Sequence, residues 1–218
     1  MTISADAIKA SMRASMAGAT HSDKPYKTWL LTHVLPDDAA DVIMDLPFPA
    51  PKLGGLSGKR ELHNGTRKYF DAGNAAEYPV IAAFNSAFTD PQMIRDIEAF
   101  FDISLKGSFL RAEYAQDTDD FWLEPHTDLG VKLFTMLLYM SKDEAHRDLG
   151  TDVYDVDKKH VARSPFAFNS AFIFIPGTDT YHGFEPRKIP GVRKSVIINY
   201  VTPEWRAREQ LANPDTPL

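Results

Sequence analysis

Residues 124 to 140 read EPHTDLGVKLFTMLLYM, and the fold is inferred from this stretch outward. Its second half, 133–140, is a run of apolar residues of the kind that suits a buried strand. Its first half carries His126 and Asp128, two metal-binding side chains separated by a single residue. Because alternate residues of a strand project from the same face, we expect both side chains to point into the space that the sheet encloses.

The composition is that of a globular protein of one domain. A chain of 218 residues is long enough to bury a large core, and we predict a single domain over 1–218. The formal net charge of −6 argues against nucleic acid or an anionic membrane as a partner. No cysteine is present, which excludes disulfides and thiolate metal sites, so any metal must be held by His, Asp or Glu.

Two observations bear on location. No stretch of the sequence is long and apolar enough to cross a bilayer. At the N-terminus, Asp6, Lys9 and Arg13 interrupt the place where a signal peptide has its apolar segment. We therefore expect a cytoplasmic protein.

Most of the predicted helices precede most of the predicted strands. After one strand predicted at 27–34, a helix is predicted after Pro36, and two further helices are predicted at 76–88 and 91–101. From about 108 onward the pattern is one of short strands, at 108–115, 121–128, 132–141, 150–155, 165–168, 171–175, 180–185 and 193–201. This order predicts an α+β protein whose catalytic half is a β-sandwich or jelly roll.

Loops and ends complete the pattern. Residues 47–75 are rich in proline and glycine, which predicts a long loop that could be a lid over a site. The basic residues in it, Arg67 among them, have a simple interpretation as solvated charges. A short helix is predicted after Thr202, and the tail from Asn213 is expected to be disordered.

A third metal ligand is predicted at His182, which follows an apolar strand and the turn Pro176-Gly177. Two histidines and one carboxylate form the facial triad of non-haem Fe(II) oxygenases, which leaves coordination positions free for a 2-oxo acid and O₂. The far carboxylate of 2-oxoglutarate needs a cation, and arginine binds carboxylates with a planar fork of donors. Arg193 and Ser195 alternate onto one face of the last strand, where both could meet that carboxylate.

In these residues the sequence resembles the Fe(II)/2-oxoglutarate-dependent oxygenases, in particular their prolyl-4-hydroxylase-like bacterial branch. The resemblance covers roughly 108–202 and implies a double-stranded β-helix (jelly-roll or cupin-like) core with N-terminal supporting helices. It also implies that Tyr114 hydrogen-bonds the cosubstrate, and Thr135 is a further candidate for the cosubstrate pocket. The residues that carry it are His126-Thr-Asp128, the strand Thr135 to Tyr139, Gly150-Thr151, His182 and Arg193-Lys-Ser195.

The resemblance implies a reaction in which Fe(II), 2-oxoglutarate and O₂ hydroxylate an aliphatic C–H bond and release succinate and CO₂. Asp128 favours hydroxylation over halogenation, because related halogenases leave that position free for halide. The substrate is a small molecule or a peptide, recognised through loops such as 47–75 and 142–149. Its identity, the carbon oxidised and the oligomeric state stay open.

Two alternatives remain at this stage. One is a cupin-like protein that holds another metal, as an isomerase, a hydrolase or a structural metal protein. The other is a module that binds iron and 2-oxoglutarate without turnover. A clamp for a dicarboxylate at Arg193 and Ser195 disfavours the first, and the intact triad disfavours the second.

Overall fold

The computed structural model describes residues 3–51, 58–59, 67–119, 121–128 and 130–218. Within these ranges the helices lie in the N-terminal half, as predicted. Their bounds are Ala5–Ala17 (α1), Asp37–Met44 (α2), Ala72–Glu77 (α3), Pro79–Phe88 (α4) and Pro91–Phe101 (α5).

The helix expected over 76–88 is wrong as a single element. It divides into α3 and α4 at Tyr78, which has extended backbone angles. Pro79 is the cause, because proline has no N–H to continue a helix and favours the first helical position instead. The prediction for α5 is confirmed, since the Asp90 side chain accepts hydrogen bonds from the amides of Gln92 and Met93.

Two antiparallel sheets follow, which confirms the predicted double-stranded β-helix core. The larger sheet has the strand order β1-β2-β9-β6-β11-β4-β3, and the smaller one has the order β5-β10-β7-β8. The larger sheet comprises Thr20–Ser22 (β1), Thr28–Thr32 (β2), Ser170–Phe174 (β9), Lys132–Tyr139 (β6), Arg193–Val201 (β11), Phe109–Asp117 (β4) and Lys68–Tyr69 (β3). The smaller comprises Leu123–His126 (β5), His182–Phe184 (β10), Asp152–Tyr154 (β7) and His160–Arg163 (β8).

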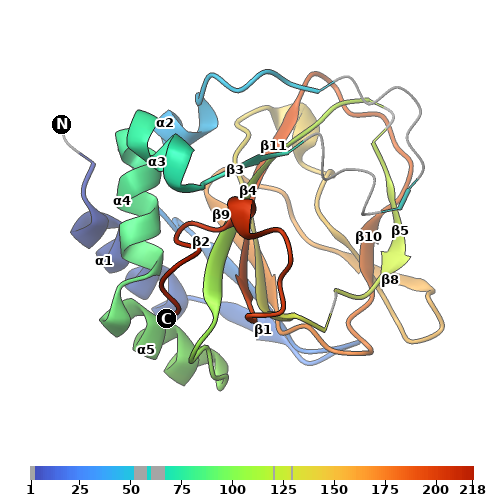
Figure 1. Ribbon diagram of the computed structural model, residues 1–218. Helices are drawn as coiled ribbons and strands as arrows, with labels where there is room; N and C mark the ends of the chain where they lie inside the picture. Colours follow the sequence, from blue (N-terminus) through green and yellow to red (C-terminus); the bar gives the residue numbers. More distant parts are fainter. Residues whose placement is uncertain (1–2, 52–57, 60–66, 120, 129) are drawn as a thin grey trace.

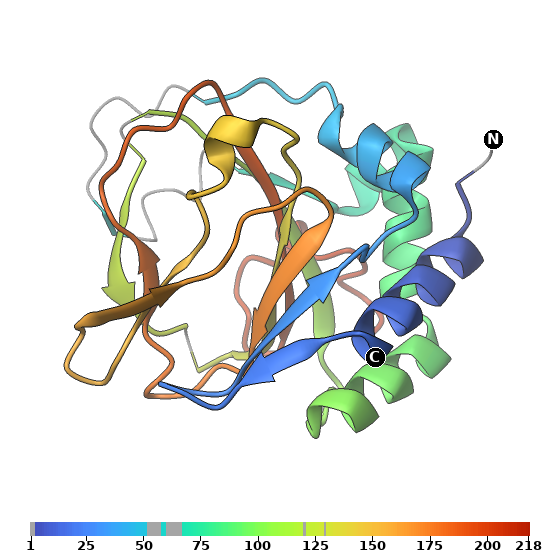
Figure 2. The ribbon, with the colours of Figure 1, turned by 180° about the vertical axis from the view of Figure 1, so that it is seen from behind.

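The helices pack on one face of the larger sheet, and the smaller sheet lies on its other side (Figure 1; Figure 2 shows the same layers from behind). Alternation along β11 follows this division. Val196, Ile198 and Tyr200 belong to the core beneath the helices, while Arg193 and Ser195 line a pocket on the inner face. The helices therefore support a sheet whose opposite face is available for chemistry.

Three expectations outside the core need correction. The strand expected at 165–168 is instead β8 at His160–Arg163, followed at 165 by a proline that cannot donate to a sheet. The short helix expected after Thr202 is a 3-10 turn at Arg208–Gln210. The tail from Asn213 is ordered at its end, because the Leu218 amide donates to Ser108 O at 2.9 Å.

Much of the predicted 47–75 loop, namely 52–57 and 60–66, lies outside the described residues. In the described part of the chain, no helix has the length and apolar character needed to cross a membrane.

Candidate active site

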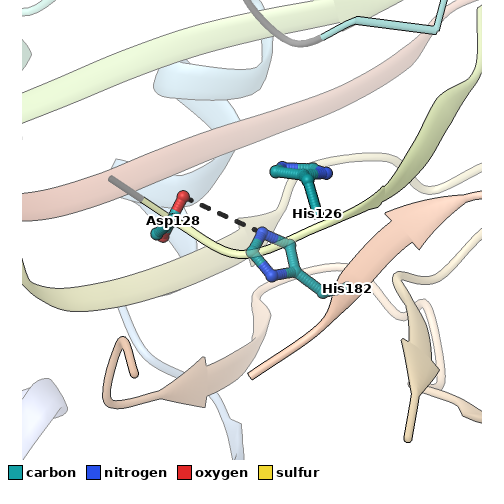
Figure 3. Close-up of side chains that lie close together, drawn as sticks. All are labelled: His126, Asp128 and His182. Carbon is teal, nitrogen blue, oxygen red and sulfur yellow. Dashed lines mark ion pairs between the residues drawn. The ribbon is translucent and has the colours of Figure 1, made fainter. Parts of the chain in front are cut away.

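Three candidate metal ligands come together where the smaller sheet faces strand β6 of the larger one. His126 ends β5, His182 begins β10, and the two residues are direct partners in the antiparallel register. Their ligand atoms and those of Asp128 all lie within 4.8 Å of one another. Figure 3 shows the three side chains converging, with His182 Nε2 at 3.9 Å from Asp128 Oδ1.

The reason given for their convergence from sequence is partly wrong. Strand β5 ends at His126, so Asp128 lies in the loop beyond the strand rather than two positions along it. Its carboxylate is positioned by hydrogen bonds to β6. Thr135 Oγ1 donates to Asp128 Oδ2 at 2.5 Å, and Lys132 Nζ donates to Oδ1 at 2.5 Å.

Both imidazoles present the same nitrogen to the common space. His126 Nδ1 lies 2.8 Å from Glu124 O, and His182 Nδ1 lies 3.0 Å from Thr180 O. A carbonyl oxygen can only accept, so each Nδ1 carries a proton and each Nε2 is the ring nitrogen left to bind a metal. Burial and the nearby His182 lower the pKa of His126 to about 3, which keeps its imidazole in the neutral, metal-binding form.

Asp128 is held ionised. Burial of the carboxyl opposes ionisation, but the charges of Lys132 and His182 and the two hydrogen bonds outweigh it. The pKa of Asp128 therefore lies well below its ordinary value. Two imidazole nitrogens and one carboxylate form the donor set that suits Fe(II) with open coordination positions, so the residues fit such an ion.

The triad lines a pocket that also reaches Arg193 and Ser195 on β11. Thr135 and Thr151 contribute hydroxyl groups to its wall. Ser195 is 1% exposed, and among the described residues its Oγ has no hydrogen-bond partner. A buried hydroxyl without a partner is costly, so a ligand that bonds this hydroxyl would be stabilised at this wall. Apolar side chains line the rest of the pocket: Phe121, Leu123, Leu137, Phe184 and Ile197.

Arg193 is buried, and its guanidinium is already held by the protein. Its Nε donates to Leu149 O at 2.6 Å, and its Nη1 donates to Asp117 Oδ2 at 2.5 Å. The guanidinium also lies 4.8 Å from the centre of the Phe184 ring. Asp117 in turn accepts from Arg67 Nη1 at 2.6 Å.

Tyr114, which was predicted to contact the cosubstrate, is not among the described residues that line the pocket with the triad. Its ring belongs to the core beneath the helices, and its hydroxyl donates to Met44 O at 2.9 Å. The reason is strand alternation. Tyr114 is paired with Val196, which faces away from the pocket, whereas Asp117 is paired with Arg193 and faces into it.

The charged pocket residues that the sequence does not predict are Arg67, Asp117 and Lys132. The loop pattern predicts a solvated charge at Arg67, yet this residue is only 6% exposed. For Asp117 a signal existed, because Arg111, Glu113 and Asp117 recur on one face of an otherwise apolar strand. Charged residues on the inward face of a buried strand indicate a paired network or a site.

No family model matches the sequence, and no curated protein matches it either. Solved structures do match in fold. The chain has the double-stranded β-helix fold of the 2-oxoglutarate oxygenases. A Pseudomonas putida prolyl-4-hydroxylase is 14% identical, with a TM-score of 0.55, over 89% of this chain and 92% of its own.

Two further structures share the fold. A Trichoplax adhaerens prolyl hydroxylase, in complex with a peptide fragment of hypoxia-inducible factor, is 13% identical with a TM-score of 0.56, over 90% of both chains. HygX from Streptomyces hygroscopicus, with nickel and 2-oxoglutarate bound, is 14% identical with a TM-score of 0.54, over 82% of this chain and 84% of its own.

Proposed function

We propose that the protein is an Fe(II)- and 2-oxoglutarate-dependent dioxygenase that hydroxylates an aliphatic C–H bond. The observation that carries the proposal is one pocket containing both halves of such a site. At one place the Nε2 atoms of two imidazoles and a carboxylate converge, and the same pocket is lined by a buried arginine and by a serine hydroxyl that has no partner among the described residues. The shared fold supports it.

His126, Asp128 and His182 would hold the metal, and Arg193 with Ser195 would bind the distal carboxylate of 2-oxoglutarate. When bound, iron and 2-oxoglutarate supply the oxidation of a C–H bond by O₂, with release of succinate and CO₂. Thr135 serves the metal ligand rather than the cosubstrate directly, because its hydroxyl proton is donated to Asp128. Phe184, Leu137 and Ile197 exclude water from the reacting centre.

The substrate in this proposal is a small molecule or a peptide, and the whole chain acts as one catalytic domain in the cytoplasm. The net charge of −6 supports a partner other than nucleic acid. A third protein ligand at Asp128 supports hydroxylation over halogenation.

The test is the formation of succinate from 2-oxoglutarate in air with Fe(II), using panels of amino acids, hydroxy acids and short peptides. We expect succinate release that depends on iron, is raised by the substrate, and is lost in Asp128→Ala. Asp157→Asn removes an exposed carboxylate outside the pocket and serves as the control with unchanged turnover. Metal binding without any succinate, in all panels, would contradict an oxygenase and favour the metal-binding alternatives.

A further inference from the structure

Five buried charged residues form a ladder of alternating sign that ends at the pocket. Arg111 Nη2 donates to Glu113 Oε2 at 2.6 Å, and Glu113 Oε1 lies 3.3 Å from Arg67 Nε. Arg67 and Arg193 then bind opposite oxygens of Asp117, at 2.6 and 2.5 Å. All five residues are at most 6% exposed.

The ladder contains three arginines and two carboxylates, so one positive charge is uncompensated. At its far end, Arg111 is bonded to Gln210 and Asn199 and lies against the rings of Tyr69 and Trp205. These neutral groups stabilise a buried guanidinium there. At the near end, the partners of Arg193 among the described residues are Asp117, a carbonyl oxygen and aromatic rings. Arg193 lines the pocket beside the Ser195 hydroxyl, which has no partner in the described part of the chain.

Asp117 creates a conflict in that pocket. Its carboxylate lines the same wall as Arg193 and binds that arginine, so it competes with any ligand carboxylate that approaches. Left alone, a buried carboxylate would repel such a ligand. Arg67 offsets this, because it binds the other oxygen of Asp117 from within the pocket wall.

We propose that Asp117 and Arg67 are specificity-determining residues that set the affinity of the pocket for a dicarboxylate. Arg67 neutralises Asp117, which frees the charge of Arg193 for the distal carboxylate of the cosubstrate. This inference rests on the proposed function. Its consequence is that affinity for the second carboxylate follows the net charge of the ladder, which is +1 in the native chain.

The charge count makes opposite predictions for two substitutions. Asp117→Asn raises the ladder to +2 and removes the competing carboxylate, so 2-oxoglutarate binds more tightly. Arg67→Gln lowers it to zero and leaves Asp117 dependent on Arg193, so 2-oxoglutarate binds more weakly. The double variant returns to +1 and regains native affinity.

The experiment is calorimetric titration of Zn(II)-loaded protein with 2-oxoglutarate and with pyruvate, for the native chain, the two single variants and the double variant. Pyruvate carries the same 2-oxo acid group without the distal carboxylate. We expect the preference for 2-oxoglutarate over pyruvate to fall about tenfold in Arg67→Gln and to rise about tenfold in Asp117→Asn, the size common for charges in contact. Pyruvate affinity stays unchanged in all variants. The surface control Arg95→Gln, on the exposed side of α5, changes the affinity for neither acid.

The outcomes separate the two proposals. Equal binding of both acids by the native chain, or binding of neither, would overturn this inference together with the proposed function. Suppose the native chain prefers 2-oxoglutarate, but both single variants shift that preference in the same direction. This result would overturn the present inference alone, and so would a double variant whose preference is lower than that of either single variant. If Asp117→Asn does not fold, Arg67→Lys provides the test, because lysine keeps the positive charge. We expect Arg67→Lys to show the native preference for 2-oxoglutarate over pyruvate. A loss of preference equal to that of Arg67→Gln would overturn the inference.

Discussion

Two buried aspartates in this protein, Asp128 and Asp152, each lie within a cluster of potential metal ligands, yet only one cluster suits a metal. Asp152 lies with His160 and Glu185 in an arrangement whose ligand atoms are as close together as those of the triad. The difference lies in what already occupies the carboxylate oxygens.

Asp152 is saturated. One oxygen accepts from Arg163 Nε at 2.6 Å and lies 3.1 Å from His160 Nε2, and the other accepts from Arg187 Nη1 at 2.5 Å and the Glu185 amide at 2.7 Å. A carboxylate offers about four lone-pair directions, and here four donors occupy them. Two guanidinium groups on Asp152 would also repel a cation, whereas the carboxylate of Asp128 is bonded to one ammonium group, that of Lys132.

Asp128 keeps capacity for a ligand. From the described residues, each of its oxygens accepts one hydrogen bond, Oδ1 from Lys132 and Oδ2 from Thr135. Its other neighbours are two imidazoles that contact backbone carbonyls through Nδ1, which leaves Nε2 as the nitrogen for a metal. Proximity of acidic and histidine side chains is therefore a weak criterion for a metal site, and the number of hydrogen bonds that the carboxylate already accepts is a stronger one.

The largest effect expected from this comparison is on metal affinity. Groups that only orient a metal ligand typically contribute about 10- to 100-fold to metal affinity. His182→Ala removes a direct ligand, so the affinity for Fe(II) or Co(II) should fall by more than that. His160→Ala removes the imidazole of the other cluster and should leave metal affinity unchanged. Anaerobic metal titration of both variants measures this, and equal losses would contradict the assignment.

The Asp152 cluster should matter for stability instead. Asp152→Asn leaves buried guanidinium charge uncompensated, which should lower the free energy of unfolding by about 3 kcal/mol at pH 7. Urea unfolding measures it, and bound metal per chain should remain that of the native protein. A loss of metal with no loss of stability would reverse the roles of the two aspartates.

The stability difference between the native protein and Asp152→Asn should also depend on pH. Burial opposes ionisation of Asp152, but its bonds to Arg187, Glu185 and Arg163 outweigh this and place its pKa below the ordinary value. A depressed carboxyl pKa gives stability that is present above the unfolded-state pKa of about 4 and is lost as the pH falls through the folded-state pKa. The stability difference between native protein and Asp152→Asn should therefore shrink below about pH 4 in urea titrations at stepped pH. A constant difference down to pH 2 would contradict this.

A smaller effect on metal affinity is expected from Thr135, which bonds the candidate ligand Asp128. Thr135→Val removes the hydrogen bond to Asp128 without changing side-chain volume much, and metal affinity should fall by about tenfold, within the range for groups that orient ligands. Thr151→Val serves as the matched control, because Thr151 lines the same pocket and bonds Tyr139 rather than a candidate ligand. Identical affinities for the two variants would show that Thr135 has no such role.

The smallest effect concerns Tyr114. Tyr114→Phe removes only the hydrogen bond to Met44 O, so stability should fall by about 1 kcal/mol and 2-oxoglutarate affinity should stay the same. Thermal unfolding and ligand titration measure the two quantities. A marked loss of 2-oxoglutarate affinity would mean that this tyrosine reaches the pocket after all.

The sequence predicts the fold well, because strand and helix signals are local. Alternation along β11 and the cap at Asp90 both follow from neighbouring residues, and both are found in the structure. The residues proposed as metal ligands could be predicted from the sequence because, without cysteine, few residue types can bind a metal. Errors in element bounds, such as the break at Pro79, come from single residues that override a longer pattern.

Interactions between segments that are distant in the chain could not be predicted from local sequence patterns. The register that places Asp117, rather than Tyr114, opposite Arg193 depends on how two strands pair, which spacing alone does not determine. Burial of Arg67 depends on its pairing with Asp117, fifty positions later. A charged residue in a Pro- and Gly-rich loop gives no local sign of such a partner.

The central claim, that one pocket binds Fe(II) and 2-oxoglutarate together, is tested most directly by anaerobic titration while the weak visible charge-transfer band of that complex is recorded. We predict a band in the native protein, none in His182→Ala, and a band in Arg193→Ala only at far higher 2-oxoglutarate concentration. Bound iron with no band at any 2-oxoglutarate concentration would contradict the account.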